Sequence, residues 1–266
     1  MSYIAIVNRS SMITSSELLT ITQAIQIQVN LHFLPAWNLK SATVKFFADE
    51  KDIPGYAWVI YVIDSQASVP GALGYHQEES SGKIDGYIMC EPILSNGGDV
   101  LKFDANNPGK YTVSGTLSHE ICECIIDIYT NFWCDNGTTS WCKEVADPVE
   151  QVGYGVMVDG VEVAVSDFVF PSFFNPDATL IKNAPFNYLN TLTAPFTMLS
   201  GGYSIQRTGS PGTETQVFGE EMPQWRRDTK RFKFNRKFPK NQETIITNRP
   251  GQHIAKKSFW QKLIGK

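Results

Sequence analysis

Residues 3–37 read "YIAIVNRSSMITSSELLTITQAIQIQVNLHFLPAW", and this stretch decides which kind of fold the chain can adopt. Its opening, "YIAIVN", is short and rich in β-branched residues, as strands are. A Ser-rich segment with Glu17 in the first turn then leads into apolar residues at near-helical spacing, a pattern that we expect to end before Pro35. The stretch therefore predicts a strand followed by an amphipathic helix. The apolar helical positions are Leu18, Leu19, Ile25, Val29 and Phe33.

Three later stretches have the character of strands. The segments "ATVKFFA" (42–48) and "YAWVIYVID" (56–64) are short, rich in β-branched and aromatic residues, and bounded by Pro and Gly. A loop containing "PGALGYHQ" (70–77) separates them from a further predicted strand, "DGYIMCEPIL" (85–94). The order β-α-β-β-β up to residue 95 predicts a layer of sheet and helix, of the α/β or α+β class.

Two further elements follow. A second helix is predicted over about residues 113–130, with Ser114 or Thr116 as its cap. Downstream, "GYGVMVDGVEVAVSDFVF" (153–170) contains two alternating runs that meet at Asp159-Gly160. This dipeptide suits a type I′ turn, so the segment predicts a β-hairpin.

The composition is that of an ordinary globular protein. Of the 266 residues, 42% are hydrophobic and 19% are charged, which is enough apolar material for a core. Nowhere do about 18 apolar residues follow one another, and the N-terminal residues lack a basic segment followed by an apolar run. We therefore predict no signal peptide, no membrane span and no membrane partner. The five cysteines, an odd number, indicate reduced thiols in an intracellular protein, although Cys134 and Cys142 could pair under oxidising conditions.

The net charge of −4 hides a strong asymmetry along the chain. Residues 1–221 carry 10 Lys/Arg against 25 Asp/Glu, a net charge of −15, whereas residues 222–266 carry 13 against 2, a net charge of +11. Before the change of sign, "GGYSIQRTGSPGTETQ" (201–216) has the Gly, Ser, Thr and Pro content of a flexible linker. The pattern predicts an acidic folded body and a basic arm that binds an anionic partner.

The second predicted helix carries an unusual set of charged residues in "SHEICECIID" (118–127). His119 and Glu123 are four apart and share a face, Asp127 lies a turn further along, and Glu120 sits beside this stripe. The spacing is that of the H-E-x-x-H zinc motif, with Glu in place of the second His. Because the flanking residues are apolar, acids on this helix are costly unless they are paired or coordinated. We interpret His119 and Glu123 as metal ligands; the alternative is a solvated helix face with His119 hydrogen-bonded locally.

A catalytic metal needs a third protein ligand, and "CKEVADPVE" (142–150) offers two candidates. Glu144 and Asp147 are three apart and face the same way if this segment begins as a helix. Glu144 is the preferred ligand, and Asp147 then orients His119 through its second ring nitrogen. One His and two carboxylates form a harder set than His-rich ones, so zinc is expected but manganese or calcium also fits. Glu120 is the expected general base, which takes a proton from metal-bound water.

Three other polar residues are candidates for the site. His76 lies in a predicted loop, where a histidine is more often solvated or hydrogen-bonded than functional. Asp167 interrupts an apolar strand, so it is either a satisfied core acid or a site residue. Asp127 either caps the helix or supports a metal ligand from behind.

Seven segments together resemble a family of uncharacterised bacterial and phage proteins that look like zinc-dependent metallopeptidases. The resemblance covers roughly residues 3–206, and the chain after about residue 210 has no counterpart in it. It implies a zincin-like fold with a twisted mixed sheet, an active-site helix that carries His119, Glu120 and Glu123, and an edge strand that receives an extended peptide. We expect "DGYIMCEPIL" to be that strand. The matching segments are "IAIVNRS", "AIQIQVNLHFLPAW", "GALGYH", "SHEICECIID", "KEVADPVE", "YGVMVDGVEVAVSDFVFPSFF" and "GGYSIQ".

These observations predict an α+β fold in three parts: a metallopeptidase-like domain (1–206), a linker (207–221) and a basic attachment arm (222–266). The predicted function is a metal-dependent hydrolase, most simply a zinc peptidase that acts on peptides or proteins. The rival hypothesis is a structural protein of a phage virion that keeps the same scaffold and docks through its arm. In the arm, "WRRDTKRFKFNRKF" (225–238) interleaves aromatic and cationic residues, which favours a protein partner over nucleic acid. The expected location is therefore cytoplasmic or virion-associated.

Overall fold

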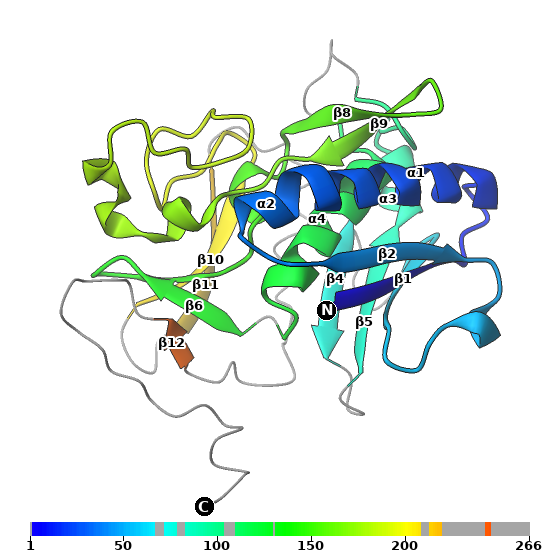
Figure 1. Ribbon diagram of the computed structural model, residues 1–266, viewed down its shortest axis with the longest axis horizontal. Helices are drawn as coiled ribbons and strands as arrows, with labels where there is room; N and C mark the ends of the chain where they lie inside the picture. The colour runs from blue at the N-terminus through cyan, green and yellow to red at the C-terminus, as the bar shows by residue number, and fades with distance from the viewer. Residues whose placement is uncertain are drawn as a thin grey trace, which may run out of the picture.

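The chain folds as a mixed α+β protein, seen here in a computed structural model (Figure 1). Within the described residues, most of the regular structure lies in two five-stranded sheets, a two-stranded hairpin and a few helices. This arrangement confirms the predicted α+β class. The described residues are 2–66, 72–78, 83–103, 110–129, 131–208 and 213–219, together with the backbone of 243–245.

The first sheet is mixed and has the strand order β2-β1-β3-β5-β4. β1 pairs in parallel with both β2 and β3, and β3 pairs in parallel with β5, whereas β4 runs antiparallel to β5. The strands predicted from β-branched and aromatic content are present in it. The bounds are β1 Ser2–Asn8, β2 Ala42–Phe47, β3 Trp58–Ile63, β4 Gly74–Glu78 and β5 Ile84–Met89.

The edge strand beside the site helix is β4, and not the segment 85–94 that we expected there. That segment is divided, because its first part forms the interior strand β5 and its second part forms the short helix α3 (Cys90–Leu94). Pro92 lacks the N–H that a longer strand would need, but a proline is tolerated in the first turn of a helix. β4 lies where we predicted a loop, since "GYHQE" lacks the alternation of apolar and polar residues that signals a strand.

The first helix, α1 (Ser15–Gln28), starts at a capping box, as the Ser-rich segment with Glu17 indicated. The backbone N–H of Glu17 donates to the Thr14 hydroxyl, and the Glu17 carboxylate accepts from the Thr14 N–H. The helical path does not end before Pro35 as predicted, because it continues through the π-helical turn η1 (Val29–Phe33). Pro35 stands at the start of the next helix, where its missing N–H breaks no helical bond. That helix is α2 (Leu34–Ala36).

The site helix, α4 (Val113–Ile126), starts where we predicted it and ends earlier, at Asp127. Its N-cap is Thr112 and not Ser114 or Thr116, because the Thr112 hydroxyl accepts the backbone N–H three residues further on. Nearly every residue of α4 is buried, so this is a core helix and not a surface helix with one apolar stripe.

The hairpin predicted at Asp159-Gly160 is present as β8 (Gly153–Val158) and β9 (Val161–Ser166). The two turn residues have φ values of 48° and 83°, as a type I′ turn requires. Both α1 and α4 contact the first sheet and this hairpin (Figure 1). Apolar side chains of all these elements form one core cluster, which fixes the orientation of α4 and of its charged residues.

The second sheet has the strand order β11-β10-β7-β6-β12. β10 (Tyr203–Thr208) and β11 (Thr213–Phe218) pair antiparallel, so the linker predicted over residues 207–221 contains strand structure and the boundary at residue 206 falls inside β10. Thr, Val and Phe in β11 favour a strand, and the Gly and Ser content of the neighbouring residues concealed it. The remaining strands are β6 Phe132–Asp135, β7 Ser140–Cys142 and β12 Glu243–Ile245.

Three expectations about the whole chain can be compared with the described residues. All five cysteines are buried thiols outside any disulfide, including Cys134 and Cys142. Apart from the backbone of β12, the predicted attachment arm at 222–266 lies outside the described residues. None of the described helices combines the length and the apolar character that a bilayer span requires.

Candidate metal centre

Helix α4 directs three charged side chains into the protein interior. His119, Glu120 and Glu123 are buried, with 6%, 6% and 4% of their surface exposed. Leu117 and Ile121 of the same helix belong to the apolar core cluster, so the helix is held on several sides. Charged groups at this depth are stable only when other groups satisfy them. The alternative of a solvated helix face is therefore wrong.

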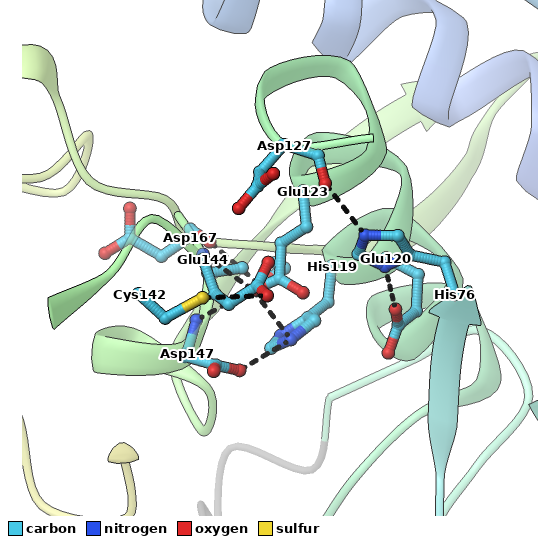
Figure 2. A network of polar contacts seen from close by, with 11 residues as sticks. His76, His119, Glu120, Glu123, Asp127, Cys142, Glu144, Asp147 and Asp167 are labelled. Carbon is cyan, nitrogen blue, oxygen red and sulfur yellow. Dashed lines mark hydrogen bonds and ion pairs between the residues drawn. The ribbon is translucent and has the colours of Figure 1, made fainter. Parts of the chain in front are cut away.

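His119 meets two carboxylates at a single ring nitrogen (Figure 2). Its Nε2 lies 3.3 Å from Oε1 of Glu123 and 3.2 Å from Oδ1 of Asp147, which begins the 3-10 turn η3 (Asp147–Val149). Ligand-type atoms of these three residues all lie within 4.8 Å of one another. Oε1 of Glu123 also accepts the backbone N–H groups of Ala146 and Asp147, both at 3.2 Å. These bonds hold the η3 turn against the helix and so place Asp147.

The chemistry of this group fits a divalent cation. A ring nitrogen carries at most one hydrogen, so Nε2 of His119 cannot satisfy two ionised carboxylates, which also repel each other. Burial by itself lowers the pKa of His119, but Glu123 and Asp147 outweigh it and raise that pKa well above its usual range. Burial also raises the pKa of Glu123 well above its usual range. Without a metal, a proton is shared among His119, Glu123 and Asp147. A metal ion with N and O ligands fits the same place.

Glu144, the preferred third ligand, lies in a neighbouring group with Asp127 and Cys142. The Sγ of Cys142 donates to Oε1 of Glu144 at 3.2 Å. Asp127 is the residue at which α4 ends, and its two oxygens accept backbone N–H groups of the chain beyond the helix, both at 2.9 Å. Burial and the nearby Glu144 raise the pKa of Asp127 to about 7. The geometry thus favours Asp147 over Glu144 as the third ligand beside His119.

Glu120 points from another side of α4, toward the edge strand β4 (Figure 2). Its Oε2 lies 3.0 Å from Nδ1 of His76, and Nε2 of His76 lies 3.2 Å from the carbonyl oxygen of Asp127. Burial lowers the pKa of His76, but Cys124 and Glu120 outweigh it and raise that pKa well above its usual range. His76 therefore lies in a strand and not in the predicted loop, and of the solvated and hydrogen-bonded alternatives the contacts support a buried, hydrogen-bonded histidine.

A pocket opens beside these residues. Its wall includes His119 and Glu120 of α4, Gly74 of β4 and Tyr203 of β10. The Tyr203 hydroxyl donates to Asp147, and burial together with nearby carboxylates raises the pKa of this phenol well above its usual range. The wall of one pocket therefore contains the imidazole of His119, the carboxylate of Glu120 and the phenol of Tyr203.

Asp167 does not line the pocket. Among the described residues, it also does not belong to any cluster of side chains that could hold a metal ion. Its Oδ1 accepts the backbone N–H of Phe168 at 2.7 Å, and its Oδ2 accepts Nδ2 of Asn187 at 2.5 Å. Burial raises its pKa to about 6. Of the two interpretations offered by the sequence, the contacts support a satisfied core acid.

Sequence reasoning missed two features of this arrangement. Tyr203 lies at the end of the predicted domain, in a Gly- and Ser-rich stretch that indicated no site residue, and its place beside Asp147 depends on the pairing of β10 with β7. The contact between His76 and Glu120 joins residues 44 positions apart, which no local spacing encodes. The available signal was the residue type itself, since histidine is a common proton carrier and ligand.

Comparisons with family models, with curated proteins and with solved structures found no match to this chain. The functional argument therefore rests on the side-chain geometry of the described residues.

Proposed function

We propose that this protein is a metal-dependent hydrolase of the zincin type that cleaves peptide bonds. The observation that carries the proposal is the convergence of His119, Glu123 and Asp147. His119 and Glu120 both line one pocket. Three N and O ligands are the number that catalytic zinc sites use, because one position then stays open for water or substrate. Zinc is the expected metal, and the two carboxylates also suit manganese or calcium.

Each side chain has a distinct role in this proposal. His119, Glu123 and Asp147 hold the ion, which when bound supplies Lewis acidity to water and to the substrate carbonyl. Glu120 accepts a proton from water and returns it to the leaving amine. Tyr203 holds Asp147 in place through its hydroxyl.

An extended peptide is the substrate that fits the edge of the first sheet. β4 stands last in the strand order of the first sheet, and an extended peptide is the kind of ligand that adds to such a strand through backbone hydrogen bonds. Gly74, the first residue of β4, and Leu73 just before it line the pocket that also contains Glu120. A peptide paired with β4 therefore brings its backbone to the general base.

Replacement of Glu120 by Gln tests the proposal. The amide cannot accept a proton from water, so we expect peptide cleavage to fall by about 10²–10⁴-fold. The variant should keep the same metal content as the wild type, because Glu120 is not among the ligands. Elemental analysis and a broad peptide-cleavage assay measure both quantities. Unchanged turnover removes Glu120 from the mechanism, and wild-type protein without stoichiometric metal removes the centre itself.

The charge asymmetry favours a second candidate function, a structural attachment protein of an assembly such as a phage virion. The excess of positive charge in residues 222–266 suits docking to an acidic surface of a protein partner. Truncation after residue 219 keeps β11 and all four residues of the proposed centre. We expect the truncated protein to stay folded and metal-loaded while losing its partner. Loss of the fold on truncation contradicts the separation of arm and body.

A further inference from the structure

His76 connects the edge strand to two points of the site helix (Figure 2). Its side chain is buried on β4, and its two ring nitrogens have different partners. Nδ1 lies 3.0 Å from Oε2 of Glu120, in the body of α4, and Nε2 lies 3.2 Å from the backbone carbonyl oxygen of Asp127, the residue after α4. The end of the helix therefore fixes the orientation of the imidazole ring.

These partners decide which atoms carry hydrogen. A carbonyl oxygen only accepts, so Nε2 of His76 carries a hydrogen and donates it to Asp127. The other nitrogen, Nδ1, faces a carboxylate oxygen, so one further proton lies between Nδ1 and Oε2 of Glu120. Such a bond is charge-assisted, and in a buried place it holds the carboxylate more firmly than a bond in water does.

The second oxygen of Glu120, Oε1, lies next to Gly74 of β4. A Cβ atom placed on Gly74 would lie 2.8 Å from Oε1 of Glu120, and both residues line the pocket. A glycine at this position leaves Oε1 the room that any other side chain would take. Oε2 is thus engaged by His76, while Oε1 lies beside Gly74, another residue of the pocket wall.

We propose that His76 is a positioning residue for the general base, because it holds Oε2 of Glu120 so that Oε1 receives the proton. This inference rests on the proposed function, in which Glu120 is the base. A base works only when its oxygen lies within hydrogen-bonding reach of the proton, and a displacement of about 1 Å costs about 100-fold in rate. His76 acts through Glu120 and not on the substrate.

Two substitutions at His76 separate this role from a merely structural one. In His76→Asn the amide nitrogen takes the place of Nδ1 and keeps the donor to Glu120, while the contact with Asp127 is lost. In His76→Gln the amide nitrogen reaches the place of Nε2 and keeps the donor to Asp127, while the contact with Glu120 is lost. We expect His76→Gln to lower kcat by about 10- to 100-fold at unchanged KM, and His76→Asn to keep kcat within about threefold. Metal content should be unchanged in both.

His32→Gln is the matched control, because His32 is bonded to Tyr154 at 2.8 Å and does not line the pocket. Wild-type kcat in His76→Gln, or equal losses in the Gln and Asn variants, overturns the positioning role. Crystal structures of the metal-loaded variants give a readout that is independent of activity. They should show the Glu120 carboxylate in place in His76→Asn and rotated in His76→Gln.

Failure of this inference is distinguishable from failure of the proposed function. If the wild type cleaves no peptide, the proposed function fails, and the position of the Glu120 carboxylate in the variant structures still decides the role of His76. A carboxylate in the same position in all three proteins overturns the inference.

Discussion

Two groups of buried acids in this molecule differ in what surrounds them. Asp167 gives its oxygens to Asn187 and to backbone N–H groups, all of which are neutral donors. Glu123 and Asp147 instead meet at one nitrogen of His119. Burial raises the pKa of Asp167 and of Glu123 alike. A raised pKa therefore does not distinguish a functional acid from a structural one, whereas the identity of the partners does.

The Asp167 group serves the fold. Asn187 donates to Asp167 and uses its own side-chain oxygen to accept the backbone N–H groups of Thr191 and Leu192. The pair thereby ties an irregular, aromatic-rich segment to the end of β9. We expect damage to this group to reduce stability, and damage to the His119 group to reduce metal binding.

The largest effect is expected from Asp147→Asn. The amide removes one charge and one anionic ligand beside His119, so the affinity for a divalent metal should fall by about 100-fold or more. The fold should persist, because the repulsion between Asp147 and Glu123 is also relieved. Competition with a chromophoric chelator measures the affinity, and circular dichroism monitors the fold.

Glu144→Gln is the matched control for this comparison, because Glu144 lies in the neighbouring group with Cys142. It should change metal affinity by less than about tenfold. If Glu144→Gln loses the metal and Asp147→Asn keeps it, Glu144 is the third ligand and the assignment is reversed.

Much of the fold could be predicted from local sequence pattern, whereas strand order could not. The capping segment around Glu17 and the turn at Asp159-Gly160 each have a local physical cause, and the start of the helix and the hairpin formed as predicted. The edge position of β4 depends on pairing with β5 and on no property of its own five residues. The segment 207–221 shows the same limit, because its strand exists through pairing with β10.

The helical half of the candidate site was visible in the sequence, and the other half was not. His119 and Glu123 lie four apart, and helix geometry alone brings them together. The third ligand could be Glu144 or Asp147 from the sequence alone. Glu123 accepts the backbone N–H groups of Ala146 and Asp147, and these bonds place Asp147 beside His119, which a spacing of three residues does not reveal.

The Asp167 group should give stability a pH dependence of up to about 3 kcal/mol. Its pKa in the folded protein is about 6, against an ordinary value of 3.8, so between these values the folded protein keeps a proton that the unfolded chain has released. The contribution of this group to the free energy of unfolding is therefore greatest below about pH 4 and falls as the pH rises through about 6.

Urea unfolding at about pH 4 and about pH 7 measures this contribution when wild type is compared with Asp167→Asn. The wild type should lose more stability than the variant over this interval, by about 3 kcal/mol at most. Metal content should be the same in both proteins, in contrast to Asp147→Asn. Equal losses in the two proteins contradict the assignment of a raised pKa to Asp167.

The smallest effect is expected from Tyr203→Phe. Its hydroxyl donates to Asp147, so the variant loses one contact that orients a ligand and should bind metal up to about tenfold more weakly. Tyr154→Phe is the control, because that hydroxyl is bonded to His32. The chelator assay described for Asp147→Asn measures the metal affinity of Tyr203→Phe and Tyr154→Phe. If the wild type and these two variants bind metal equally well, Tyr203 has no part in the centre.

Anomalous diffraction from zinc-saturated crystals of the wild-type protein tests the central claim most directly. The account predicts one anomalous peak at about 2.0–2.2 Å from Nε2 of His119 and from one oxygen each of Glu123 and Asp147. Zinc-saturated crystals without a peak at this position, and with Nε2 of His119 still in direct contact with the two carboxylates, contradict the account.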